Sequence, residues 1–151
     1  MGGNFDEARR HFEDSVRLAV EIDHNWAAAY ALVGLGGAET RLGQYREAGV
    51  HLREAYRRAS ARRHLDLVLA VLAGLAALRQ AEGDRDRAAG LASLVVNHPA
   101  AWTEARAQAN HILKDLGIEP PAKHGEHSQV GCGADELERA ASMLEPELDT
   151  S

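Results

Sequence analysis

Histidine and cysteine are the residues of this 151-residue sequence that would first suggest a metal site. His124, His127 and Cys132 stand at a spacing close to that of zinc ligands. They supply only three ligands, whereas a structural zinc site takes four. They also lie in a stretch with the composition of a linker. We therefore predict no metal and no other cofactor.

Motifs of catalysis are the next chemistry to consider. The sequence contains no glycine-rich phosphate loop after a strand, no nucleophile elbow and no HExxH motif. The glycine-rich residues 34–37 fall in the middle of a predicted helix, and no strand precedes them. Cys132 has basic residues only at a distance, so its thiol lacks the environment of a nucleophile. We predict that the protein is not an enzyme.

A basic stripe could bind an anion, because arginine forks grip phosphate and carboxylate groups bidentately. The alternative is a solvated helix face that runs into a loop. A third interpretation is that the acidic residues of 135–149 dock on the stripe. The stripe consists of Arg53, Arg57, Arg58, Arg62 and Arg63.

Composition excludes several classes of protein. The net charge is −6, which gives no reason to expect direct nucleic-acid binding. A single cysteine rules out an intramolecular disulfide and fits a reducing compartment. No apolar run approaches a membrane span, and the N-terminus has no signal-peptide pattern. We predict a cytoplasmic protein that does not bind membranes.

The elements that must position any site follow a repeat. One pattern of glycine, a polar residue, usually an aromatic residue, two charges and alanine occurs at residues 3–8, 43–48 and 83–88, an interval of 40 residues. A fixed period of this kind is typical of a solenoid built from helix pairs. Alanine and leucine supply most of the apolar content, which favours helices over strands. The predicted fold class is all-α.

The helix boundaries follow from helical periodicity and from three local signals. These are a break at Asn25, which is a plausible N-cap, a left-handed conformation at Gly43, and Pro99, which cannot extend a helix. The predicted helices span 4–21, 26–42, 45–60, 65–82, 85–96 and 101–116. The first domain, 1–116, divides into a half repeat (3–24), two repeats (25–64 and 65–99) and a cap (101–116). Residues 117–151 form a predicted flexible Pro/Gly linker and acidic tail, with a short helix over 135–144.

Residues 3–97 resemble the tetratricopeptide repeat (TPR) family in a version lengthened to 40 residues. The sequence departs from the family at Leu32 and Leu72, where a bulky aromatic residue is usual, and at Arg85. The resemblance implies a right-handed superhelix of antiparallel helix pairs with a C-terminal capping helix. The matching columns are Leu32/Leu72, Leu35/Leu75, Gly36/Ala76, Ala48/Ala88 and Ala55/Val95.

The resemblance also implies a function. In such arrays the first helices of successive pairs line a concave groove, so we predict a non-catalytic module that binds a protein or peptide. The long repeat is also loosely similar to the C-terminal sensor arrays of bacterial signal-transduction ATPases that regulate transcription. The groove positions would be Tyr30, Val33, Gly37, Thr40, Arg41, Ala73, Ala77 and Gln80. Small groove residues could instead serve only helix packing.

Two alternatives have a different basis. The first repeat lacks its first helix, so Phe5, Phe12 and Val16 would be uncovered and could form the face of a homodimer. The arginine stripe could sense phosphate or an acidic ligand. Trp26 and Trp102 each open a helix, and we predict structural roles for both.

Overall fold

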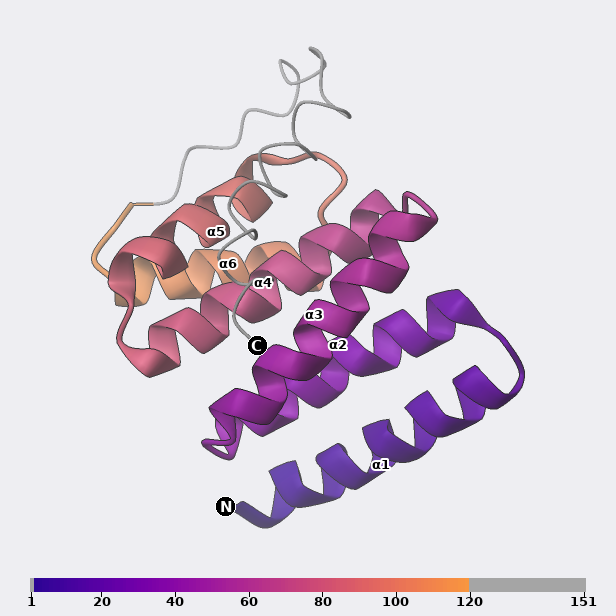
Figure 1. Cartoon of the computed structure of the whole chain (residues 1–151). Coiled ribbons are helices and arrows are strands. Elements are labelled where there is room, and N and C mark those ends of the chain that lie inside the picture. Colours follow the sequence, from indigo (N-terminus) through magenta and orange to yellow (C-terminus); the bar gives the residue numbers. More distant parts are fainter. Residues whose placement is uncertain (1, 120–151) are drawn as a thin grey trace.

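The computed structural model describes residues 2–119, and in this range its regular structure consists of six α-helices and no strand (Figure 1). Each helix begins and ends within two residues of the predicted boundary, and the predicted all-α fold is confirmed. The acidic tail, with the predicted helix over 135–144, lies outside the described residues. The helices are α1 (Gly2–Glu21), α2 (Asn25–Arg41), α3 (Tyr45–Ala61), α4 (Leu65–Glu82), α5 (Arg85–Asn97) and α6 (Thr103–Asp115).

The turns between the first five helices recur at a fixed interval. Asp23, Gly43, Arg63 and Gly83 all have a positive φ, and they follow one another every 20 residues. Glycine adopts this left-handed conformation without a steric cost, which suits Gly43 and Gly83 to end α2 and α4. The left-handed conformation predicted for Gly43 is confirmed, with a φ of 80°.

The N-cap of α2 is His24, which corrects the prediction of Asn25. The Nδ1 atom of His24 accepts a hydrogen bond from the N–H of Ala27 at 3.3 Å. Asn25 is the first residue of the helix, and its side-chain amide donates to the carbonyl oxygen of Arg58 at 3.0 Å. Nη1 of Arg58 in turn donates to Oδ1 of Asn25 at 3.1 Å. Asn25 therefore links the start of α2 to the end of α3.

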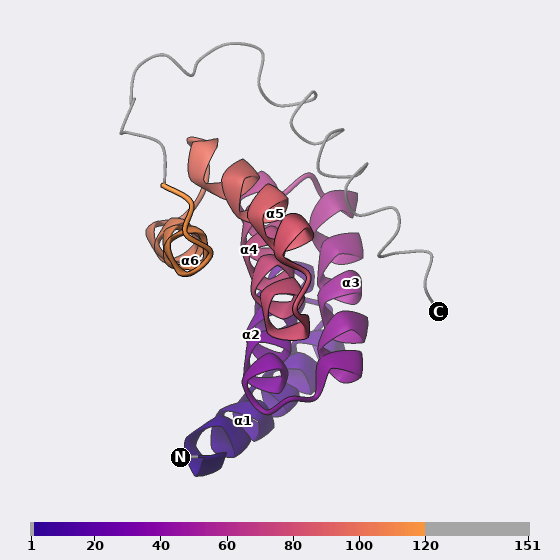
Figure 2. The same cartoon turned by 90° about the vertical axis from the view of Figure 1, so that its left-hand side faces the viewer.

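Helices that follow one another in the sequence pack against one another, and two further contacts join alternate helices. α2 packs against α4, and α4 packs against α6. Figure 2 shows α6 and α3 on opposite sides of α4, with α1 at the far end of the molecule from α5. The face of α2 and α4 that α3 does not cover is thereby flanked by α1 and α6.

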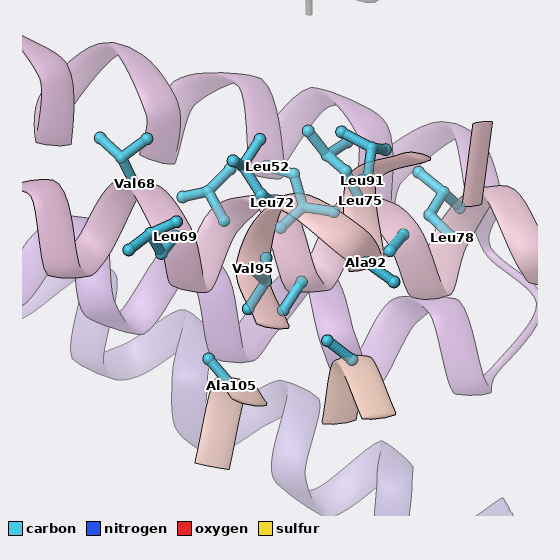
Figure 3. Close-up of a cluster of buried hydrophobic side chains, with 14 of the residues drawn as sticks. Leu52, Val68, Leu69, Leu72, Leu75, Leu78, Leu91, Ala92, Val95 and Ala105 are labelled. Carbon is cyan, nitrogen blue, oxygen red and sulfur yellow. The ribbon is translucent and has the colours of Figure 1, made fainter. Parts of the chain in front are cut away.

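The core is centred on α4. Eleven of its 18 residues are buried, in a run from Leu67 to Ala76 and at Leu78, because α2, α3, α5 and α6 pack around this helix. A helix that is apolar on all sides belongs in an interior. Figure 3 shows four leucines of α4 together with Leu52 of α3 and Leu91 of α5; the four are Leu69, Leu72, Leu75 and Leu78.

Leu52 joins three helices at one point. Its side chain is fully buried where glycines of α2 and α4 leave room for it. A Cβ atom at Gly36 would lie 2.7 Å from Cγ of Leu52, and one at Gly74 would lie 3.0 Å from Cδ2. The small residues of α2 and α4 thus set how closely α3 can approach.

α1 packs on α2 through one face. The ring of Phe12 occupies the space over Gly34, where an added Cβ atom would collide with it. Phe12 and Val16 both pack against the core and are partly buried, so α2 covers much of the stripe that the sequence analysis left uncovered. Among residues 2–119, no helix combines the length and apolar character needed to cross a membrane.

Candidate functional site

An open hollow of about 260 Å³ lies between α1, α2, α4 and α6, and we call it the main hollow. Its floor consists of small residues of α2 and α4, and Gly37 is the one of its three glycines with no atom within 4 Å of the position a Cβ would take. The floor residues are Gly34, Gly37, Ala70 and Gly74. The walls are Phe12 from α1, Tyr30 and Val33 from α2, and Trp102, Glu104, Ala105 and Gln108 from α6 and its N-cap.

Three aromatic side chains meet at the edge of the main hollow and form what we call the aromatic corner: Trp26, Tyr30 and Trp102. The rings of Trp26 and Tyr30 stack with centroids 5.3 Å apart and an interplanar angle of 15°. The ring of Trp102 is tilted towards both, with centroid distances of 6.3 Å to Trp26 and 5.7 Å to Tyr30. Offset and tilted pairs at these separations are favourable aromatic contacts.

A second hollow, of about 350 Å³, opens over the aromatic corner. Thr103 and Glu104 complete its lining. Trp26 and Tyr30 remain 36% and 43% exposed, so parts of their rings are accessible to a ligand. The two hollows share Tyr30, Trp102 and Glu104 and are therefore adjacent.

The structure brings together some of the predicted groove residues and separates others. Tyr30, Val33 and Gly37 line the main hollow. Ala73 is fully buried in the core and faces no ligand, while Ala70 and Gly74 of the same helix line the hollow. This difference arises because a shift of one residue along a helix turns the side chain by about 100°.

The predicted polar end of the groove is also placed differently. Thr40 is buried, and its hydroxyl donates to the carbonyl oxygen of Gly36 at 2.8 Å. The guanidinium of Arg41 lies over the ring of Phe5, 5.4 Å from its centroid. Ala77 and Gln80 are partly buried and line neither of the two hollows. Thr40 and Arg41 likewise line neither of the two hollows.

The wall from α6 is what the sequence reasoning missed. That helix was predicted only as a cap, and Trp26 and Trp102 were assigned separate structural roles. Both tryptophans stand at the start of a helix, and α2 and α6 flank α4 from two sides. This shared position at helix starts was the one signal in the sequence that could have suggested their meeting.

Arg57 and Arg58, two residues of the arginine stripe on α3, have partners within the chain. Both pair with Glu54, at 2.6 and 3.0 Å, and Arg58 also bonds to Asn25. Arg63 lies in the turn after α3, with a positive φ. The acidic residues predicted to dock on the stripe lie outside the described residues.

A buried ion pair stands apart from both hollows. Glu39 of α2 is only 2% exposed, and its Oε1 atom lies 2.8 Å from Nδ1 of His51 on α3. The hydrogen bond to Glu39 raises the pKa of His51 above its usual value of 6.5, and the charges of Glu39, Glu13 and Glu47 act in the same direction. Partial burial of the ring acts in the opposite direction.

Metal ligands do not cluster in the described range: residues 2–119 contain no group of three or more His, Cys, Asp or Glu side chains placed to hold a metal ion. The candidates His124, His127 and Cys132 lie outside that range.

Comparisons with family models, curated proteins and solved structures return no match for this chain.

Proposed function

We propose that the chain is a TPR-like helical-repeat module that binds an apolar helix of a partner protein in the main hollow, without catalysis. In this proposal α2, α4 and α6 are the first helices of three successive pairs in a right-handed superhelix. The regular turns and the packing of α2 on α4 and of α4 on α6 support that assignment. A terminal array of a larger bacterial regulator, in the cytoplasm, is the setting we propose.

The observation that carries the proposal is the floor of small residues beneath an open apolar hollow. Gly34 and Gly37, which are partly buried, line this hollow together with the small buried residues Ala70 and Gly74. Glycine inside a helix destabilises it by about 0.5–1 kcal/mol relative to alanine. Gly37 has no neighbouring atom within 4 Å of the position a Cβ would take, so packing within residues 2–119 does not require a glycine there. We propose that the close approach of a partner helix is what requires a glycine at this position.

The volume indicates what such a partner would insert. A cavity of about 150 Å³ holds one benzene molecule, so the main hollow has room for about two apolar side chains. An amphipathic helix presents side chains at i and i+4 on one face, one above the other. Two such residues match the hollow, and the flanking surfaces of α1 and α6 would contact the rest of the helix.

The test is to fill the hollow from within. Gly37→Leu adds an aliphatic side chain that starts at a Cβ position with no described atom within 4 Å. Peptides selected from a displayed library of helical sequences should bind the wild-type chain and lose affinity for Gly37→Leu by about tenfold or more. Binding can be followed by tryptophan fluorescence, because the only two tryptophans of the chain lie in the aromatic corner.

Ala107→Leu is the matched control, since Ala107 is an exposed residue of α6 that lines neither hollow. This variant should bind the selected peptides as the wild type does. Peptides that bind Gly37→Leu and the wild type equally well would contradict the proposal, and so would a selection that yields no binder.

Self-association through α1 is a second candidate, favoured by a specific observation. Ala8 and Ser15 occupy the same repeat positions as Ala48 and Ala55 of α3, which are fully buried. Ala8 is only partly buried and Ser15 is exposed, because no described helix stands where α2 stands for α3. Beside this open face, Leu18 and Ile22 are 59% and 62% exposed. We propose that a second copy of the chain covers these two side chains and the open face.

This open face differs from the predicted one. Phe12 and Val16 pack on α2 of the same chain, and Phe5 has the guanidinium of Arg41 over its ring. A dimer through α1 would therefore use Leu18 and Ile22, which lie one helical turn apart, in place of Phe5, Phe12 and Val16.

A further inference from the structure

The aromatic corner and Glu104 point to a specific chemistry for one residue of the partner. We infer that the second hollow binds a cationic side chain, lysine or arginine, carried by the helix that occupies the main hollow. This inference rests on the proposed function, because it assigns the partner's charge at one position.

The geometry of the three aromatic rings favours a cation in the second hollow. The faces of aromatic rings carry partial negative charge and attract cations, and tryptophan attracts them most strongly. The second hollow is lined by two tryptophans and a tyrosine, whose rings converge within 5.3 to 6.3 Å of one another. A cation in this hollow would be close to three rings at once, which a single exposed aromatic residue cannot offer.

The charge of the lining also favours a cation. Glu104 is the one charged residue in the lining of either hollow. Its carboxylate is exposed, and within residues 2–119 it forms no ion pair or hydrogen bond with another side chain. A negative charge that borders three aromatic rings and has no partner in that range is complementary to an incoming ammonium or guanidinium group.

A simpler role for Glu104 has to be separated from this one. Glu104 is the second residue of α6, and a carboxylate in a first turn stabilises a helix through the macrodipole. Asp86 holds the same position in α5, is also exposed and lines neither hollow. The two residues should therefore affect helix stability similarly, whereas only Glu104 should affect the binding of a cation.

The adjacency of the two hollows determines at which position of the partner helix the cationic residue would stand. Because they share Tyr30, Trp102 and Glu104, a helix with two apolar residues one turn apart in the main hollow reaches the second hollow one turn further on. The inferred partner helix thus has two aliphatic residues at i and i+4 and a lysine or arginine one turn before or after them.

The experiment uses the full chain and two pairs of synthetic amphipathic helical peptides. Each peptide has leucines at i and i+4. One pair has lysine or acetyl-lysine one turn before the leucines, and the other pair has them one turn after. Acetylation removes the charge and keeps the stem. Quenching or shift of the tryptophan emission measures the affinity, since both tryptophans border the second hollow.

The expected result is that, in one of the two pairs, the lysine peptide binds about tenfold more tightly than its acetylated counterpart. This preference should disappear in Glu104→Gln, which leaves all three rings in place, and should persist in Asp86→Asn. Circular dichroism of both variants checks that the helices are intact. Added salt should weaken the preference, because the carboxylate is exposed.

Different failures have different meanings. Equal affinity of the lysine and acetyl-lysine peptides in both pairs would overturn the inference while leaving the proposed function intact, provided that Gly37→Leu still weakens binding of the peptides. A preference for the lysine peptide that survives in Glu104→Gln would also overturn it, and so would one that is lost equally in Asp86→Asn. Failure of all four peptides to bind would count against the proposed function as well.

Discussion

At the scale of single residues, the most consequential polar contact is the pair of Glu39 and His51. A buried carboxylate without a partner is costly, and the imidazole of His51 is the partner that α3 supplies. Because the carboxylate favours the protonated ring, the pKa of His51 is raised in the folded chain. Protonation of one histidine therefore stabilises the contact between α2 and α3.

The first prediction concerns the pH dependence of this pair. A pKa that is raised on folding contributes stability below about pH 6.5, and this contribution is lost as the pH rises through the folded-state value. His51→Gln, which keeps a neutral donor, should lower the free energy of unfolding by about 1–2 kcal/mol near pH 6. The deficit should shrink towards pH 9. Urea denaturation at a series of pH values measures it.

His111→Gln is the control for this prediction. His111 is exposed and pairs with Asp115 on the surface of α6, a kind of contact that contributes little to stability. A His51→Gln deficit that stays the same from pH 6 to pH 9, or one that His111→Gln reproduces, would show that the ion pair with Glu39 is not its cause.

At the scale of helices, the packing of α2 on α3 depends on which of two neighbouring glycines faces Leu52. Gly36 is buried against this leucine, whereas Gly37 faces the main hollow with no atom within 4 Å of its Cβ position. The two positions are adjacent in one helix, so they share the same intrinsic helix propensity. Their difference in packing is therefore directly measurable.

The second prediction compares two alanine substitutions in α2. Gly37→Ala should raise the free energy of unfolding by up to about 1 kcal/mol, because alanine favours the helix and meets no neighbour. Gly36→Ala should lower it by about 1–2 kcal/mol, because overpacking against the buried Leu52 exceeds the gain in propensity. Thermal or urea unfolding of both variants measures the difference. Two changes of the same sign would contradict the packing described for Leu52.

At the scale of the whole molecule, the helices differ in how far other helices cover them. α4 is enclosed by four helices, whereas α1 has its extensive packing on α2. Leu18 of α1 and Ile22, the first residue after α1, are thus the exposed apolar residues that association would bury.

The third prediction is the oligomeric state. The wild-type chain should form a dimer whose population rises with concentration in light scattering, and Leu18→Glu should shift it to monomer without loss of helicity. Val50→Glu is the control, since Val50 of α3 is also a half-exposed apolar residue. A wild-type chain that is monomeric at all concentrations would contradict self-association. Phe12→Asp would be a poor test, because Phe12 packs over Gly34 within the chain.

Much of this architecture is local, and the sequence by itself was sufficient for it. The spacing of apolar residues, the glycines at 43 and 83 and the proline at 99 determined six helices to within two residues. The buried columns Ala48/Ala88 and Ala55/Val95 followed from the 40-residue interval, because equivalent positions in repeated helices face equivalent neighbours.

The candidate site was only partly predictable, because it is formed by residues far apart in the chain. Trp26 and Trp102 meet only through the angles at which α2 and α6 pack around α4. Those angles depend on side-chain volumes at the helix contacts, and periodicity does not encode them. The tertiary structure alone therefore decided that α6 is a wall of the main hollow, that Ala73 lines neither hollow whereas its buried neighbour Gly74 lines the main hollow, and that Glu104 stands beside three aromatic rings.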